Sequence, residues 1–120
     1  MTPTKAERDP HGKDAHELGA KLDAGKDRLG LVFSGFSRAL QAVGGVGTYG
    51  AEKYTDNGWM SVPNAEERYL DALYRHLLAE STKGRRDADS HMLHAAHAAW
   101  NALARLELII RRAEVEMADE

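Results

Sequence analysis

The stretch NAEERYLDALYRHLLAES, residues 64–81, predicts the fold class, because it is the clearest helix in the chain. One continuous apolar stripe at helical spacing is formed by Leu70, Leu73, Tyr74, Leu77 and Leu78. Asn64 is followed three positions later by Glu67, which predicts a capping pair where this helix begins.

A second long helix is expected from the stretch DADSHMLHAAHAAWNALARL, residues 87–106, with Asp87 or Asp89 as its cap and an end near Arg112. At about 100° per residue, its apolar centre is Leu93, Ala96, Ala99, Trp100, Leu103 and Ile110. The opposite face carries His94, His97, Asn101 and Arg105. This polar line is open to two interpretations, a solvated surface or the wall of a cleft or subunit interface.

Residues 33–54 show a further apolar pattern near helical spacing, interrupted by four glycines. Because glycine costs about 1 kcal/mol relative to alanine inside a helix, we expect either a break near Gly44 and Gly45 or a backbone that something else approaches closely. The following TDNGW, residues 55–59, predicts a turn. No β-type alternation of useful length occurs, so the predicted fold is all-α: a compact bundle of three main helices plus a short extra helix, completed by oligomerisation.

With 120 residues the chain is long enough for one compact domain, which we expect to span residues 21–115. Residues 1–20 mix both charges with Pro3, Pro10 and Gly12, which predicts a flexible arm, and residues 116–120 are expected to be a frayed tail.

The formal net charge of −3 argues against duplex nucleic acid as a partner. With no cysteine the chain has neither disulfides nor a thiolate zinc site. No apolar run has the length of a signal peptide or a membrane span, so we expect a cytoplasmic protein that does not bind a membrane.

Charged residues suited to phosphate chemistry occur in several places. Lys26 and Arg28 lie in a glycine-containing loop that predicts a phosphate cradle, although its spacing is not that of a P-loop. Asp71 adjoins the apolar stripe and could be a cation ligand if it faces Glu52 or Asp89. Mg²⁺ or Mn²⁺ held by such carboxylates would suit phosphate chemistry.

A zinc site is a weaker alternative for the same region of the chain. His94 and His97, separated by three positions, could converge on one ion with Asp89 as a carboxylate ligand. Two imidazoles without a fixed third ligand are a weak signal for zinc.

Four ordered blocks, KLDAGKDRLGLV, YGAEKYTDNGW, RYLDALYRHLLA and DADSHMLHAAHAAWNAL, resemble the phage and prophage family of dATP/dGTP diphosphohydrolase amino-terminal domains. The resemblance runs from Lys21 to about Leu108. It singles out Asp23, Gly25, Lys26, Arg28, Gly50, Lys53, Tyr54, Trp59, Arg68, Tyr69, Arg75, His76, Asp87, Asp89, Ser90, His94, His97 and Asn101.

The resemblance implies a metal-dependent, MazG-like hydrolase that converts a purine deoxynucleoside triphosphate to monophosphate and pyrophosphate, in the cytoplasm of a phage-infected or lysogenic bacterium. Asp89 stands where the family commonly has glutamate, which keeps the carboxylate. The E-x-x-E and E-x-x-D helices of MazG-like enzymes are absent at the expected places. Binding without hydrolysis therefore stays open.

Three hypotheses follow. In the first, a dNTP pyrophosphohydrolase, the expected catalytic residues are Asp71, Asp89, His94 and His97. Its expected ligands for Mg²⁺ or Mn²⁺ are Glu52, Asp71, Asp89 and His94. The expected nucleotide-binding residues are Lys26, Arg28, Lys53, Tyr54, Trp59, Arg68, Arg75, His76 and Asn101. The second hypothesis is a protein that sequesters a nucleotide or a cyclic-nucleotide signal without hydrolysing it. The third is a homo-oligomer whose histidine line is only an interface.

Overall fold

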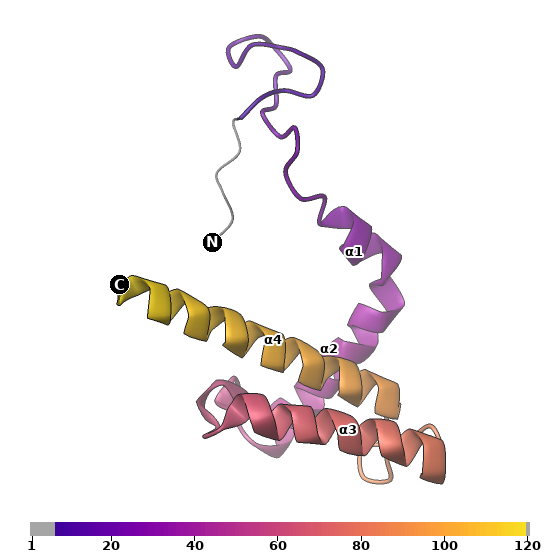
Figure 1. Ribbon diagram of the computed structural model, residues 1–120. Helices are drawn as coiled ribbons and strands as arrows, with labels where there is room; N and C mark the ends of the chain where they lie inside the picture. Colours follow the sequence, from indigo (N-terminus) through magenta and orange to yellow (C-terminus); the bar gives the residue numbers. More distant parts are fainter. Residues whose placement is uncertain (1–6, 120) are drawn as a thin grey trace. The chain divides into compact units, whose positions relative to one another are not determined.

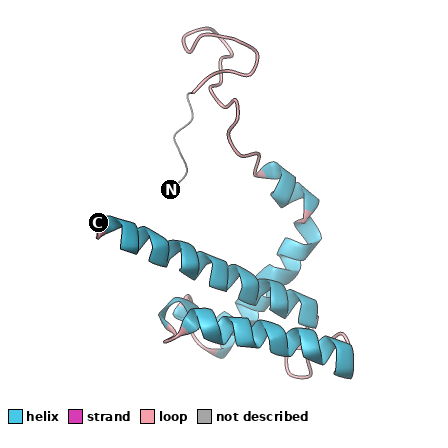
Figure 2. Cartoon of the chain, in the orientation of Figure 1, coloured by secondary structure: helices cyan, strands magenta, loops and turns pink. Residues whose placement is uncertain are grey.

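The computed structural model describes residues 7–119. The chain divides into two units, Met1–Gly35 and Phe36–Glu120. The first unit ends with helix α1 (Gly30–Gly35). The second contains α2 (Ser37–Lys53), the 3-10 helix η1 (Gly58–Ser61), α3 (Ala65–Lys83) and α4 (His94–Ala118) (Figure 1). Within the described residues there is no β-strand, only one isolated bridge between Arg86 and Leu93 (Figure 2). The predicted all-α class with three main helices is confirmed.

The division of the chain differs from the one expected. The helical unit begins at Phe36 instead of residue 21, because residues 21–29 form turns that belong with the amino-terminal unit. At the other end α4 continues through residues 116–118, where a frayed tail was expected, and Asp119 donates its N–H to the Val115 carbonyl. Residues 1–6 of the expected arm and residue 120 of the expected tail lie outside the described part of the chain.

The amino-terminal unit is organised around the buried carboxylate of Asp9. Its Oδ1 accepts the His11 N–H at 2.6 Å and its Oδ2 accepts the Lys21 N–H at 2.7 Å. Arg8 reinforces the closure, since its carbonyl accepts the Ala24 N–H at 2.9 Å. Residues 7–24 thus form a hydrogen-bonded loop, and the flexibility predicted for residues 1–20 stays a prediction.

We expect Asp9→Ala to open this loop and to increase proteolytic cleavage between residues 10 and 21 several-fold. The pKa of Asp9 is lowered, mainly by the hydrogen bond from the Lys21 N–H. The N–H groups of His11 and Lys13 and the charge of His11 add to this effect, and together they outweigh burial, which would raise the pKa. Because this pKa is depressed, the loop is stabilised above the ordinary aspartate pKa of about 3.9 and loses that stabilisation as the pH falls through the lowered value. Asp14→Ala, at an exposed position of the same loop, is the control. Equal cleavage of both variants would contradict the prediction.

Helix α2 passes through its glycines without a break. The helical stretch is instead interrupted at Phe36, between α1 and α2, and the expected break at Gly44 and Gly45 is wrong. At Gly47 a Cβ would lie 3.4 Å from Nε1 of Trp100 on α4, which is an ordinary contact distance. The alternative, a closely approached backbone, therefore stays a prediction.

Helices α3 and α4 lie side by side and antiparallel, and α2 packs against α4 (Figure 1). On α4 the buried residues are His94, Ala96, His97, Ala98, Asn101 and Ala104. The apolar centre expected for α4 is confirmed at Ala96 and at the half-buried Trp100. It is wrong at Leu93, Ala99, Leu103 and Ile110, which are all exposed. The polar line is therefore not a solvated face.

The physical reason is side-chain size. Alanines on the packed face of α4 let the neighbouring helices approach closely, and the histidines and Asn101 fill the remaining space with hydrogen-bonded groups. On α3 the leucine stripe is likewise only partly covered, with Leu77 46% and Leu78 64% exposed. The expected homo-oligomer stays a prediction, for which these exposed leucines supply an apolar surface.

Neither expected helix cap forms. Asn64 adopts a left-handed conformation (φ 53°), whereas a capping residue needs an extended one, and its side chain caps nothing. Asp87 accepts the Ser90 N–H at 2.9 Å and so closes a turn over residues 87–90, whereas α4 begins only at His94. The cap position of α4 is Leu93, so neither Asp87 nor Asp89 caps this helix. The predicted TDNGW turn is confirmed, with Asn57 left-handed (φ 58°).

Candidate functional site

A cleft of about 1260 Å³ runs between α2, α3 and α4 in the second unit. Residues of all three helices, of the 54–62 segment and of the α3–α4 loop line it. Small-molecule sites in proteins usually measure about 300–1,000 Å³. The cleft is therefore large enough for a nucleotide.

One wall of the cleft is the glycine face of α2. Gly44, Gly47 and Gly50 line it, and a Cβ at Gly50 would meet no atom within 4 Å. At these three positions no side chain projects from α2, so a ligand could approach the helix backbone there. Other residues of α2, among them Tyr49, Glu52 and Lys53, line the cleft with their side chains.

Aromatic rings surround another part of the cleft. Trp100 makes edge contacts with Trp59 and Tyr69, at ring-centroid distances of 5.9 and 5.6 Å. The Tyr69 hydroxyl donates to the Trp59 carbonyl at 2.8 Å, and burial raises the Tyr69 pKa despite the opposing charge of Arg68. Tyr54, which is 74% exposed, lies at the solvent side of the cleft. Trp59 and Tyr54 are thus rings on which a base could stack.

A cluster of histidines occupies the cleft where α3 meets the start of α4. The His76 and His97 rings are stacked at 4.5 Å with an interplanar angle of 4°, and Nδ1 of His76 lies 2.9 Å from Nδ1 of His94. Nε2 of His97 lies 2.7 Å from the Ser90 hydroxyl, and Asn101 donates from Nδ2 to the His97 carbonyl at 2.8 Å. Each ring is therefore held by at least one neighbour.

The α3–α4 loop brings Asp87 to this cluster. Two backbone hydrogen bonds of 2.8 Å, from the Asp87 N–H to the Met92 carbonyl and from the His94 N–H to the Arg85 carbonyl, close the loop. Partial burial alone would raise the Asp87 pKa, but the Ser90 N–H and hydroxyl and the nearby histidines outweigh it and lower the pKa. Burial lowers the pKa of His76 and that of His97. At neutral pH the site thus combines the neutral imidazoles of His76 and His97 with the charged carboxylate of Asp87.

Three cations line the cleft: Lys53, Arg68 and Arg75. The Lys53 Nζ lies 5.3 Å from the Tyr54 ring centroid. The pKa of Lys53 is raised, chiefly by Tyr54 and to a smaller extent by Tyr49 and Asp89. Arg68 donates from Nη1 to the Pro63 carbonyl at 3.2 Å. These three side chains could contact phosphate directly. The cleft is also lined by four carboxylates, those of Glu52, Asp56, Asp87 and Asp89.

A family model for the amino-terminal domain of dATP/dGTP diphosphohydrolases matches residues 16–118. The chain belongs to this family. No curated protein and no solved structure matches it. Membership makes it a nucleotide-handling domain of the dATP/dGTP diphosphohydrolase type, as the four sequence blocks predicted. In the described part of the chain no helix is long and apolar enough to cross a membrane.

Most residues singled out from the family blocks surround the cleft. Its lining includes Lys53, Tyr54, Trp59, Arg68, Arg75, His76, Asp89, His97 and Asn101, together with Glu52, which was expected as a metal ligand. His94 is buried beside His76 and does not line the cleft, and Asp71 is exposed on α3 outside it. Lys26 and Arg28 belong to the amino-terminal unit, where Lys26 pairs with Glu7 at 3.3 Å.

The four expected metal ligands do not gather in one place. Within residues 7–119 the one group of three metal-ligating side chains is His76, Asp87 and His94, and of these only His94 was expected as a ligand. Asp87 was expected as a cap, and His76 as a nucleotide-binding residue. Trp100, which was expected only as core, also lines the cleft. The match of Asp87, Ser90 and His76 to the family blocks was the available signal for a histidine–aspartate cluster.

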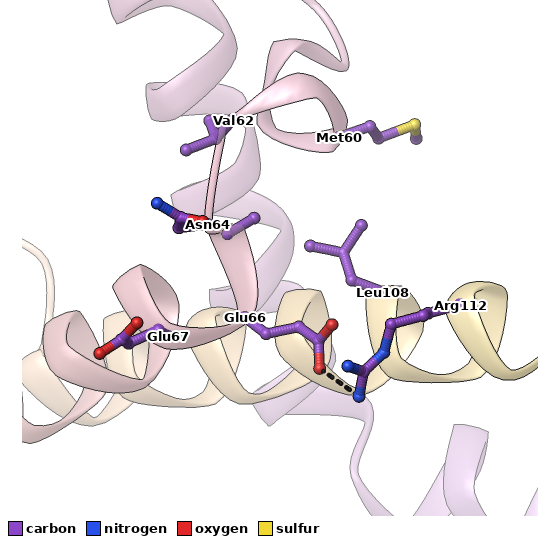
Figure 3. Close-up of a pocket in the computed structure, with 8 residues that line it drawn as sticks. Met60, Val62, Asn64, Glu66, Glu67, Leu108 and Arg112 are labelled. Atoms are coloured by element: carbon purple, nitrogen blue, oxygen red, sulfur yellow. Dashed lines mark ion pairs between the residues drawn. The ribbon is translucent and has the colours of Figure 1, made fainter.

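A second, smaller pocket of about 390 Å³ lies between η1, the start of α3 and α4. Figure 3 shows the ion pair at its edge, in which Nη2 of Arg112 lies 3.2 Å from Oε1 of Glu66. Because its one lining cation, Arg112, is already paired with a carboxylate, this pocket suits a triphosphate less well than the cleft does.

Proposed function

We propose that the cleft binds a purine deoxynucleoside triphosphate and hydrolyses it to monophosphate and pyrophosphate. The proposal rests on the residues that line the cleft, in a chain that belongs to the dATP/dGTP diphosphohydrolase family. Three cations, the rings of Trp59 and Tyr54, three glycines of α2 and four carboxylates line one cavity of about 1260 Å³. In this proposal the base stacks on Trp59 or Tyr54, while Lys53, Arg68 and Arg75 neutralise the phosphates.

The proposed reaction needs a divalent cation, Mg²⁺ or Mn²⁺, as the family implies. Mg²⁺ sites in proteins often use one or two carboxylates plus the substrate's own phosphates. Glu52 and Asp89 both line the cleft and are exposed, which fits such a site, whereas Asp71 lies outside the cleft. These two carboxylates would hold the ion, which supplies charge neutralisation and lowers the pKa of bound water. Water attacks the α-phosphorus, the bond to the bridging oxygen between the α- and β-phosphorus breaks, and pyrophosphate leaves.

The test is pyrophosphate release from each of the four dNTPs, with Mg²⁺, with Mn²⁺ and with EDTA. We expect metal-dependent release from dATP or dGTP that falls at least about tenfold in Glu52→Ala and Asp89→Ala. Glu80→Ala removes an exposed carboxylate of α3 that does not line the cleft and should retain full activity. Tight binding of intact nucleotide without metal would overturn hydrolysis in favour of sequestration, and absence of both would overturn the proposal.

A further inference from the structure

We propose that His76, Asp87 and His94 form a binding site for a six-coordinate divalent transition-metal ion, such as Mn²⁺ or Fe²⁺, at the base of the cleft. One ligand atom from each of the three side chains lies within 4.8 Å of the other two. This site is separate from the ion that Glu52 and Asp89 would hold with the nucleotide, and it does not depend on the proposed hydrolysis.

The spacing of the two imidazoles, which is also a hydrogen-bond distance, is compatible with octahedral coordination. Nδ1 of His76 and Nδ1 of His94 are 2.9 Å apart. Two nitrogens about 2.1 Å from one ion are about 3.0 Å apart at the 90° angle of an octahedral site and about 3.4 Å apart at a tetrahedral angle. A small movement of the Asp87 carboxylate would complete a facial set of two imidazoles and one carboxylate.

The donor set also selects the class of metal. Mg²⁺ and Ca²⁺ prefer ligand sets made of oxygen, whereas two imidazoles with one carboxylate occur in sites for Fe²⁺ and for Zn²⁺, so the donor set favours a transition metal. His76 and Asp87 line the cleft, and His94 is buried behind them. The open coordination positions would consequently face the cleft, where water or a phosphate oxygen could occupy them.

Neighbouring groups hold the three ligands in position. The Ser90 N–H donates to Oδ2 of Asp87, and the Ser90 hydroxyl lies beside Nε2 of His97. His97 in turn stacks on the His76 ring. Such outer partners orient metal ligands in proteins and affect metal affinity.

The test is a titration of the full chain with Mn²⁺ in the absence of nucleotide, followed by electron paramagnetic resonance, since the signal of the free aqua ion is lost on binding. We expect one ion per chain, and a Kd at least about tenfold weaker in Asp87→Asn and His76→Phe. Both substitutions preserve shape, and the second also preserves ring stacking on His97. His91→Asn, at an exposed left-handed position of the same loop, should bind Mn²⁺ as the unmodified protein does.

Two further measurements make the result decisive. Circular dichroism establishes that each variant is folded, and Co²⁺ substitution should give the weak visible bands of six-coordinate cobalt. Asp89→Asn should keep the nucleotide-free Mn²⁺ site, which separates this proposal from the one for the nucleotide's own metal. The proposal is overturned by an absence of Mn²⁺ binding, by equal binding in Asp87→Asn and the unmodified protein, or by the intense bands of tetrahedral cobalt.

Discussion

Trp100→Ala is expected to lower the free energy of unfolding by about 3 kcal/mol, the low end of the range for tryptophan truncation. Trp100 contacts Trp59 and Tyr69 and lies against Gly47, so it joins α2, α4, η1 and α3. The buried apolar residues of the described chain are otherwise small: Val46, Ala96, Ala98 and Ala104. Since domains are stable by only about 5–15 kcal/mol, this ring accounts for a large share of the total.

Urea unfolding followed by circular dichroism measures this loss. Trp100→Phe, which keeps a ring between Trp59 and Tyr69, should cost only about 1 kcal/mol. Tyr54→Ala removes a ring that is 74% exposed and should stay within about 0.5 kcal/mol of the unmodified protein. A loss below 1 kcal/mol in Trp100→Ala would show that another part of the unit carries its stability.

Helices α3 and α4 show what hydrophobic periodicity could and could not predict. The stripe from Leu70 to Leu78 correctly predicted a helix, because i, i+3 and i+4 spacing depends only on the local chain. Periodicity did not predict which face of α3 or of α4 would be covered, because that depends on where the other helices pack. On α4 the helices cover the face with alanine and histidine and leave Leu103 and Ile110 exposed.

The candidate site was predicted better by motif than by physical pattern. The family blocks pointed to residues of α2, α3 and α4 that the fold brings to one cleft, although they lie up to about fifty positions apart in sequence. Asp87 was expected as a cap because an aspartate before a helix usually acts as one. Its place beside His94 depends on the closure of the α3–α4 loop, in which His91 is left-handed. No local sequence pattern predicted this loop conformation.

Removing two cations of the cleft in Lys53→Ala/Arg75→Ala is expected to weaken binding of a non-hydrolysable α,β-methylene analogue of dATP at least a hundredfold. A hydrogen bond to a charged group is worth about 1.5–3 kcal/mol, and about 1.4 kcal/mol corresponds to a factor of ten. Both side chains line the cleft, and neither forms an ion pair within the described residues, so both charges are available to phosphate.

Isothermal titration calorimetry at two salt concentrations measures this effect. The matched control is Arg38→Ala/Lys83→Ala, which removes the same net charge from exposed positions of α2 and α3 that do not line the cleft. If the field of the whole unit attracted the nucleotide, both double variants would weaken binding equally, and the effect would largely disappear at high salt. Loss confined to Lys53→Ala/Arg75→Ala, and persisting at high salt, would indicate direct contact between these two side chains and the phosphates.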